Sequence, residues 1–270
     1  MKKLIVLLFV LGTVFSLNAQ TSQPLNAMGL NGATGIYVVP TARIAYSDAD
    51  MGFNVGYHTN FFKPANAGKT DANHLLQINF SFLRMIELSG TFDIQPEYTY
   101  GASEPNDFMI GAKFQLPFGS IPIALGANYQ ALNFGDDYAD TTAFQIYTAI
   151  TYRSDLFGWP ADTTLVVGHT FREDQNHSNI DFGMGFDLII FPSVTGNFVH
   201  FLMDFANFSY SDQPWGANAL GRGVLNTGLR LDLSQIPNLN RFTFVLDVLL
   251  IDAFDTSRSF GMGVCFGGSF

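Results

Sequence analysis

The chain has 270 residues, of which 13 are basic and 23 acidic, and charged residues make up only 13% of it. The excess of acid argues against a nucleic-acid partner, because the phosphates would be repelled. Cys265 is the one cysteine, so no internal disulfide can hold the fold together.

The first 19 residues have the three-part pattern of a secretory signal peptide. Lys2 and Lys3 form a positive start, a mostly apolar run extends from Leu4 to Val14, and Ala19 offers a small residue before the expected cleavage point. The apolar run is shorter than the roughly 20 residues that a transmembrane helix needs. We expect residues 1–19 to be removed, which leaves 11 of the 13 basic residues against 23 acidic ones, a net charge of −12.

Residues 20–50 form a separate N-terminal segment. The run Ile36 to Val39 is too apolar to be left in water, and Pro40 argues against a long central strand because proline cannot donate to a strand ladder. Two structures therefore remain open for this segment: a plug inside a barrel lumen, or an extra strand in the barrel wall. A loose periplasmic tail is the third alternative.

From residue 51 to the C terminus, apolar and polar residues alternate with period two, which indicates strands with one apolar and one polar face. About twelve segments show this pattern, each close to the length of about 10 residues that crosses a bilayer when tilted. They lie near 51–59, 74–82, 85–93, 107–116, 120–131, 142–152, 163–172, 179–191, 198–209, 223–233, 241–251 and 259–270.

The connections between these segments alternate between short turns and longer polar loops, with residues 153–162 as a long exception among the turns. Bacterial barrels have short periplasmic turns and long external loops. A soluble β-sandwich would explain neither this alternation nor the low charge. The sequence predicts an all-β protein: a transmembrane antiparallel up-and-down barrel of about 12 strands over residues 51–270, with both termini periplasmic and its place in the bacterial outer membrane.

The polar parity of the strands should face the lumen, because a charge that faces lipid costs several kcal/mol at mid-depth. These side chains are either a conduit that selects cargo or ion pairs that fill a narrow lumen. Glycines of the same parity, among them Gly56 and Gly185, either make room for a ligand or inserted segment or relieve strain. The lumen-facing candidates are Glu87, Lys113, Asp187, Asp204, Arg230, Asp232 and Asp247, together with Asp93, Arg153 and Asp181.

The terminal Phe270 falls on the lipid-facing parity of the last predicted strand, in phase with Phe266. A terminal aromatic in this position is the signal expected for recognition by the barrel-assembly machinery. The other expected contacts are outer-membrane lipid, lipopolysaccharide and other proteins of the envelope.

Signals for catalysis, a metal or a cofactor are lacking. None of the five histidines has a metal-ligand spacing such as H-E-x-x-H. His177 and Ser178 lie in an expected external loop, but no group marks them as an activated pair. We therefore expect no catalytic residue, no metal site and no cofactor.

The motif Gly35-Ile36-Tyr37-Val38-Val39-Pro40-Thr41-Ala42-Arg43 resembles the opening of the YjbH-type exopolysaccharide-associated outer-membrane β-barrel family. Looser similarity follows at Lys113-Phe114-Gln115-Leu116, at Pro122-Ile123-Ala124-Leu125-Gly126 and at Asn226-Thr227-Gly228-Leu229-Arg230. The chain would be a short, single-barrel member of that family. The resemblance implies a role in export or surface assembly of polysaccharide and no catalytic residue. A closed structural barrel within an envelope complex, and a small porin-like diffusion pore, are the alternatives.

Overall fold

A computed structural model of the chain describes residues 26–62, 70–94, 106–117, 121–132, 141–172, 180–210, 223–235, 242–254 and 258–270. The expected signal peptide, residues 1–19, and the pair His177 and Ser178 lie outside these residues. Within the described ranges no helix is long and apolar enough to cross a membrane.

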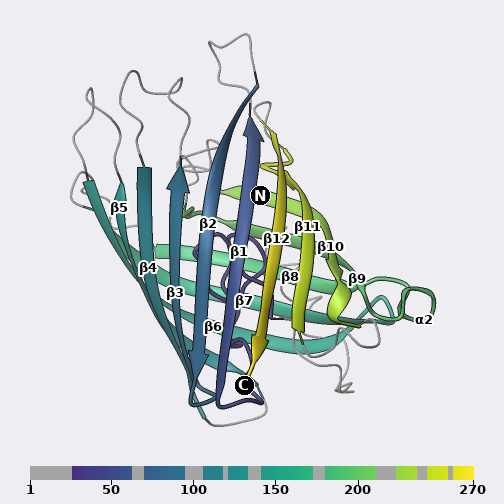
Figure 1. The fold of residues 1–270 in the computed structure, drawn as a ribbon. Coiled ribbons are helices and arrows are strands. Elements are labelled where there is room, and N and C mark those ends of the chain that lie inside the picture. The colour runs from purple at the N-terminus through teal and green to yellow at the C-terminus, as the bar shows by residue number, and fades with distance from the viewer. Residues whose placement is uncertain are drawn as a thin grey trace.

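The described residues form a closed antiparallel barrel (Figure 1). Each strand pairs with its neighbours in the chain, and the first strand pairs with the last. The prediction of an all-β barrel of about 12 strands is therefore confirmed. The strands are β1 (Met51–Phe62), β2 (Asp71–Phe82), β3 (Ile86–Ile94), β4 (Asn106–Gln115), β5 (Ile123–Leu132), β6 (Thr141–Leu156), β7 (Trp159–Arg172), β8 (Ile180–Ile189), β9 (Val199–Ala206), β10 (Val224–Asp232), β11 (Phe242–Ile251) and β12 (Ser259–Ser269).

The barrel closes where β1 and β12 run antiparallel, from Gly52 opposite Ser269 to Phe61 opposite Phe260. The C terminus lies at the end where Leu83 and Arg84 join β2 to β3 (Figure 1). We call this the turn end and the opposite one the loop end. In bacterial barrels the short turns are periplasmic, so the turn end is taken as the periplasmic end.

The two faces of each strand differ as period two requires. Phe53, Ile78, Ile110, Val167 and Phe266 are large apolar residues exposed on the outside of the barrel. The other parity points inward and carries the buried charges. A closed wall with an apolar outer face and polar inner face satisfies every strand's main chain and meets lipid without exposing charge. The chain is therefore an outer-membrane-type β-barrel.

The prediction of a long turn at residues 153–162 is wrong. β6 continues to Leu156 and β7 starts at Trp159, so only two residues make the turn. Phe157 and Gly158 have φ angles of 56° and 80°, the left-handed pair that a tight hairpin needs. Polar residues on both faces hid the strand period here.

In the part of the chain that the structure describes, helical structure lies only at the turn end. The helix α2 (Pro192–Thr195) connects β8 to β9, and a 3₁₀ turn, η2 (Leu233–Gln235), follows β10. Both are single turns, and they close strand ends without adding to the wall.

Deletion of Phe270 is expected to lower the amount of assembled barrel several-fold without changing export. Its side chain is 73% exposed on the lipid-facing parity, and its amide N–H donates to the Met51 carbonyl at 3.0 Å, where the barrel closes. Heat-modifiable migration of outer-membrane fractions measures assembly. Phe254→Ala, at an exposed aromatic of the loop end, is the control, and normal assembly after the deletion would show that the terminal aromatic is incidental.

Candidate functional site

The N-terminal residues Asn26 to Tyr46, here called the plug segment, lie inside the ring of strands (Figure 1). Both ends of the segment lie near the turn end of β1. The Asn54 side-chain amide donates to the Asn26 carbonyl at 3.1 Å, and the Tyr46 hydroxyl donates to Asn54 Oδ1 at 2.6 Å. The segment therefore enters and leaves the lumen through the same mouth.

The plug segment forms its β-bridges within itself and is not an extra strand of the barrel wall. Its two isolated β-bridges join Met28 to Thr34 and Gly35 to Pro40. Amide and hydroxyl side chains of β2 and β3 bind its first limb. Gln77 Nε2 donates to the Gly29 carbonyl at 2.6 Å, and Thr91 Oγ1 donates to the Leu30 carbonyl at 3.0 Å. These bonds satisfy main-chain groups that would otherwise be buried without partners.

Glu87 and Lys113 form one charged anchor for the plug segment. They lie opposite each other on β3 and β4, with 2.9 Å between Glu87 Oε1 and Lys113 Nζ. Glu87 also accepts from the Thr34 amide at 2.8 Å and from the Ala45 amide at 2.9 Å. One carboxylate thus ties the outgoing and returning limbs together, and Lys113 neutralises it.

Asp204 on β9 is a second anchor. Its Oδ2 atom accepts hydrogen bonds from three successive main-chain amides, those of Tyr37, Val38 and Val39, at 3.0, 2.7 and 3.1 Å. Consecutive amides that converge on one oxygen form an anion-binding nest. Asn226 Nδ2 donates to the other carboxylate oxygen at 2.8 Å.

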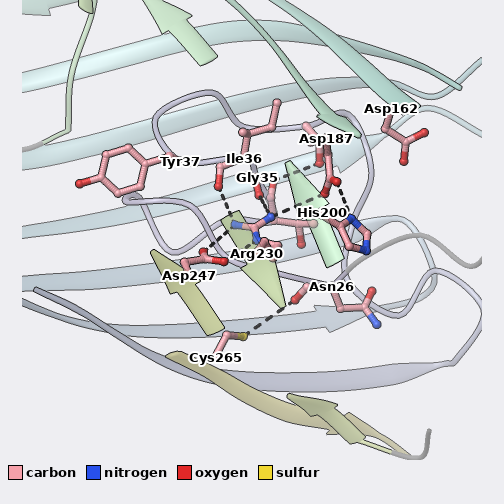
Figure 2. A network of polar contacts seen from close by, with 12 residues as sticks. Asn26, Gly35, Ile36, Tyr37, Asp162, Asp187, His200, Arg230, Asp247 and Cys265 are labelled. Carbon is pink, nitrogen blue, oxygen red and sulfur yellow. Dashed lines mark hydrogen bonds and ion pairs between the residues drawn. The ribbon is translucent and has the colours of Figure 1, made fainter. Parts of the chain in front are cut away.

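Arg230 on β10 is the third anchor (Figure 2). It joins the wall to the tip of the plug segment, by which we mean Thr34 to Val39. It makes two hydrogen bonds to Asp247 on β11, at 2.7 and 2.8 Å. Its remaining donors reach the carbonyl oxygens of Gly35 and Ile36, at 3.1 and 2.7 Å. The planar guanidinium therefore satisfies a carboxylate and two main-chain oxygens at once. Since β3 and β4 lie across the barrel from β9 to β11, the three anchors hold the tip from opposite walls.

The Arg230 network continues toward the turn end. Arg230 lies 3.9 Å from Asp187, and Asp187 contacts His200 Nδ1 at 2.5 Å. A small polar pocket of about 20 Å³ opens beside this pair, and Asp232 lines it. Asp162, which was not among the predicted lumen residues, also lines the pocket. It makes two hydrogen bonds to Arg153, at 2.8 and 2.7 Å, and lies 3.3 Å from Arg43 Nη2.

The residues of the family-like motif make the turn of the plug segment. Gly35 and Pro40 bridge each other, and the Thr41 amide donates to the Thr34 carbonyl at 3.0 Å. The Ala42 amide donates to Thr151 Oγ1 on β6 at 2.8 Å. Arg43 then points to Asp162 at the mouth. Within the motif, the main chain from Gly35 to Val39 binds Arg230 or Asp204, and the side chain of Arg43 binds Asp162.

Tyr37 caps the apolar part of the plug. Burial, with the Asp204 carboxylate nearby, raises the pKa of its hydroxyl well above the usual value. The hydroxyl therefore stays protonated and donates to Asn60 Oδ1 at 2.7 Å. This contact fixes the tip against the inner face of β1.

An apolar core fills part of the lumen, a feature that the sequence reasoning missed. Leu75, Val166, Leu202 and Leu249 point inward and pack with the apolar run of the plug segment. The sequence does contain an indication of this core, because apolar residues occur at strand positions that face the lumen. The clearest is Leu249, which interrupts the otherwise polar face of β11.

Glycines of the wall make room for the plug segment, one of the two roles considered for them. A side-chain carbon at Gly56 would lie 2.3 Å from the Met28 methyl group, and one at Gly185 would lie 2.8 Å from Ile36. At Gly126, by contrast, the space is taken by Tyr147 of the neighbouring strand.

The lumen is also filled from the loop end. After β9, Phe208 packs into the same apolar core, and the Tyr210 hydroxyl donates to Gln145 Oε1 at 2.7 Å. Gln145 donates in turn to Asp181 at 2.7 Å. Asp181 and Asp93 are both buried, at the loop-end side of the network. Among the described residues no group of three or more His, Cys, Asp or Glu side chains could hold a metal ion.

Several solved outer-membrane barrels are similar in fold. The translocator domain of the autotransporter NalP from Neisseria meningitidis aligns over 82% of this chain and 88% of its own, with 8% identity and a TM-score of 0.40. LpxR from Salmonella typhimurium aligns over 81% of this chain and 100% of its own, with 8% identity and a TM-score of 0.44. An outer membrane channel from Pseudomonas putida F1 aligns over 82% and 96%, with 10% identity and a TM-score of 0.41.

No protein-family model matches the chain, and no curated protein matches it. The strand topology and the buried N-terminal segment define the class of protein: a twelve-stranded outer-membrane-type barrel with an N-terminal segment in its lumen.

Arg230→Leu is expected to destabilise the barrel by about 3–5 kcal/mol, because Asp247 loses its buried charge partner. The double variant with Asp247→Leu should recover part of that loss, since the uncompensated charge is gone. Urea unfolding followed by tryptophan fluorescence measures both. Equal stability of Arg230→Leu and the wild type would show that Arg230 is not an anchor.

Gly32→Ala is expected to loosen the plug segment. Gly32 has a φ angle of 74°, and an added side-chain carbon would lie 2.8 Å from the Gly90 carbonyl oxygen. Gly196→Ala, at a φ angle of 60° with nothing within 4 Å, is the matched control that carries backbone strain alone. We expect about 1 kcal/mol for the control and a larger loss for Gly32→Ala in the same urea assay. Equal losses would mean that the wall does not confine the segment.

Proposed function

We propose that the protein is a barrel that is closed at rest and assists export or surface assembly of polysaccharide at the outer membrane. The observation that carries the closed state is the burial of the plug segment between anchors on opposite walls, Glu87 and Lys113 on one side and Asp204 and Arg230 on the other. An open diffusion pore would need a lumen without such a filling.

The polysaccharide part of the proposal is supported by the resemblance of Gly35 to Arg43 to the exopolysaccharide-associated family. That motif supplies the turn of the plug segment, so the residues that carry the resemblance are those that close the barrel. In this proposal the chain is exported with its signal peptide, inserted by the barrel-assembly machinery, and surrounded by outer-membrane lipid and lipopolysaccharide. It has no catalytic role.

Buried charge in the lumen bears on the cargo. Asp181, Asp204 and Asp232 add acid beyond the paired Glu87 and Asp247. An anionic polymer would be repelled by this lining. The proposal therefore favours a neutral chain rich in hydroxyl groups, which the amides and hydroxyls of the wall can bind.

A permanently closed structural barrel within an envelope complex is the second candidate. The specific observation in its favour is the apolar core that the plug segment shares with Leu75 and Leu249, because separating the two would expose apolar surface to water. Conductance separates the candidates, since a structural barrel stays closed under all conditions.

The test uses the bacterium that makes the protein. Loss of the chain is expected to lower surface polysaccharide, measured by carbohydrate staining of whole cells, and wild-type protein should restore it. A variant in which residues 35–43 are replaced by a glycine-serine linker of equal length should not restore it. Heat-modifiable migration must show that this variant still assembles.

Planar bilayers supply the second measurement. The wild type should show little conductance, and the linker variant should open a pore that prefers cations, because the lumen carries excess acid. Unchanged surface polysaccharide after loss of the chain would refute the role in export. A large, steady wild-type conductance would refute the closed state.

A further inference from the structure

We propose that the plug segment is a gate that withdraws through the turn end as one body, and that the ion pair between Arg43 and Asp162 is its latch. This inference rests on the closed resting state in the proposed function. It does not depend on what the barrel carries.

The path of the segment permits withdrawal without threading. Asn26 and Tyr46 both lie beside Asn54, near the turn end of β1. Residues 47–50 link the segment to β1 and are at least partly exposed, with Asp48 and Asp50 in water. Because the first and last residues of the segment share one mouth, its tip can leave toward the periplasm while β1 stays in the wall.

The charges of the wall keep partners when the segment leaves. Lys113 stays with Glu87, Arg230 stays with Asp247, and Asp187 stays with His200. Asp204 loses three amides but retains Asn226. Withdrawal therefore leaves none of these wall charges without a partner; an unpartnered charge would be costly in a lumen.

The segment itself is almost neutral. Arg43 is the only charged residue from position 26 to 46. It lies at the turn-end mouth, where its side chain is 19% exposed and that of Asp162 is 14% exposed. Asp162 also binds Arg153, so it remains paired when Arg43 moves away. Asp162 also lines the polar pocket, together with Arg153 and Asp187.

Arg43 is therefore the one charged group by which the mouth can hold or release the segment. The deeper contacts of the segment are hydrogen bonds and apolar packing, which resist withdrawal. Opening should consequently be rare until the latch is weakened.

Cys265 is a built-in reporter of withdrawal. It is the only cysteine of the chain, and it lies buried on the inner face of β12. Its sulfur lies 4.0 Å from the Asn26 carbonyl oxygen (Figure 2). Cys265 also packs with Ala27 and Met28 of the segment. Removal of the segment uncovers the thiol, so its modification rate measures how often the gate opens.

The experiment labels the folded full-length protein with a membrane-impermeant maleimide and follows Cys265 by mass spectrometry. Arg43→Gln is expected to raise the labelling rate about fivefold, the shift that loss of one partly exposed ion pair of about 1 kcal/mol produces. Arg84→Gln is the matched control, because it removes an ion pair with Asp50 at the same end but outside the plug segment. The control should label at the wild-type rate.

Two results would overturn the proposal. Equal labelling of Arg43→Gln and wild type would show that Arg43 is not a latch. If Cys265 in every variant is labelled no faster than the folded form is lost, as judged by heat-modifiable migration, then the thiol is reached by unfolding and not by a gate. Neither result depends on surface polysaccharide, so failure of the gate and failure of the export role can be told apart.

Discussion

The structure depends on one constraint: a polypeptide carried into a lumen must find a partner for every main-chain N–H and C=O that loses water. Between Thr34 and Val39 three charged wall groups meet this need, because Glu87 and Asp204 accept from amides and Arg230 donates to carbonyls. The lumen charges therefore have a structural reason to exist before any cargo is considered. Each is neutralised or hydrogen-bonded within the wall, which is what makes its burial tolerable.

The barrel could be predicted from the sequence because period two is forced by geometry. A strand between lipid and lumen must alternate, and twelve segments do so. The cross-strand pairs were within reach as well, since Glu87 faces Lys113 and Arg230 faces Asp247 once the register is known. The failure at residues 153–162 has the same origin: where both faces become polar, the period vanishes although the hairpin continues to Phe157 and Gly158.

The plug segment could be predicted only in outline. Pro40, which follows the apolar run Ile36 to Val39, argued against a long central strand, but it left a plug and an extra strand open. A looped segment has no period, so nothing in the sequence pairs the amides of Tyr37 to Val39 with Asp204, or Arg43 with Asp162. The best available signal lay in the wall, where inward apolar residues such as Leu249 need an apolar partner inside the barrel.

The width of the barrel explains why a separate segment fills it. Eight strands enclose a space that side chains can fill, and interiors widen as strands are added. With twelve strands, and with Gly56 and Gly185 removing side chains where the segment passes, the wall alone would leave a void. A segment whose one charged residue is the cation Arg43 fills this space without adding acid to an acidic lumen. The wall then supplies the paired charges, and the segment fills the lumen. Closure and stability of the barrel therefore depend on two different parts of one chain.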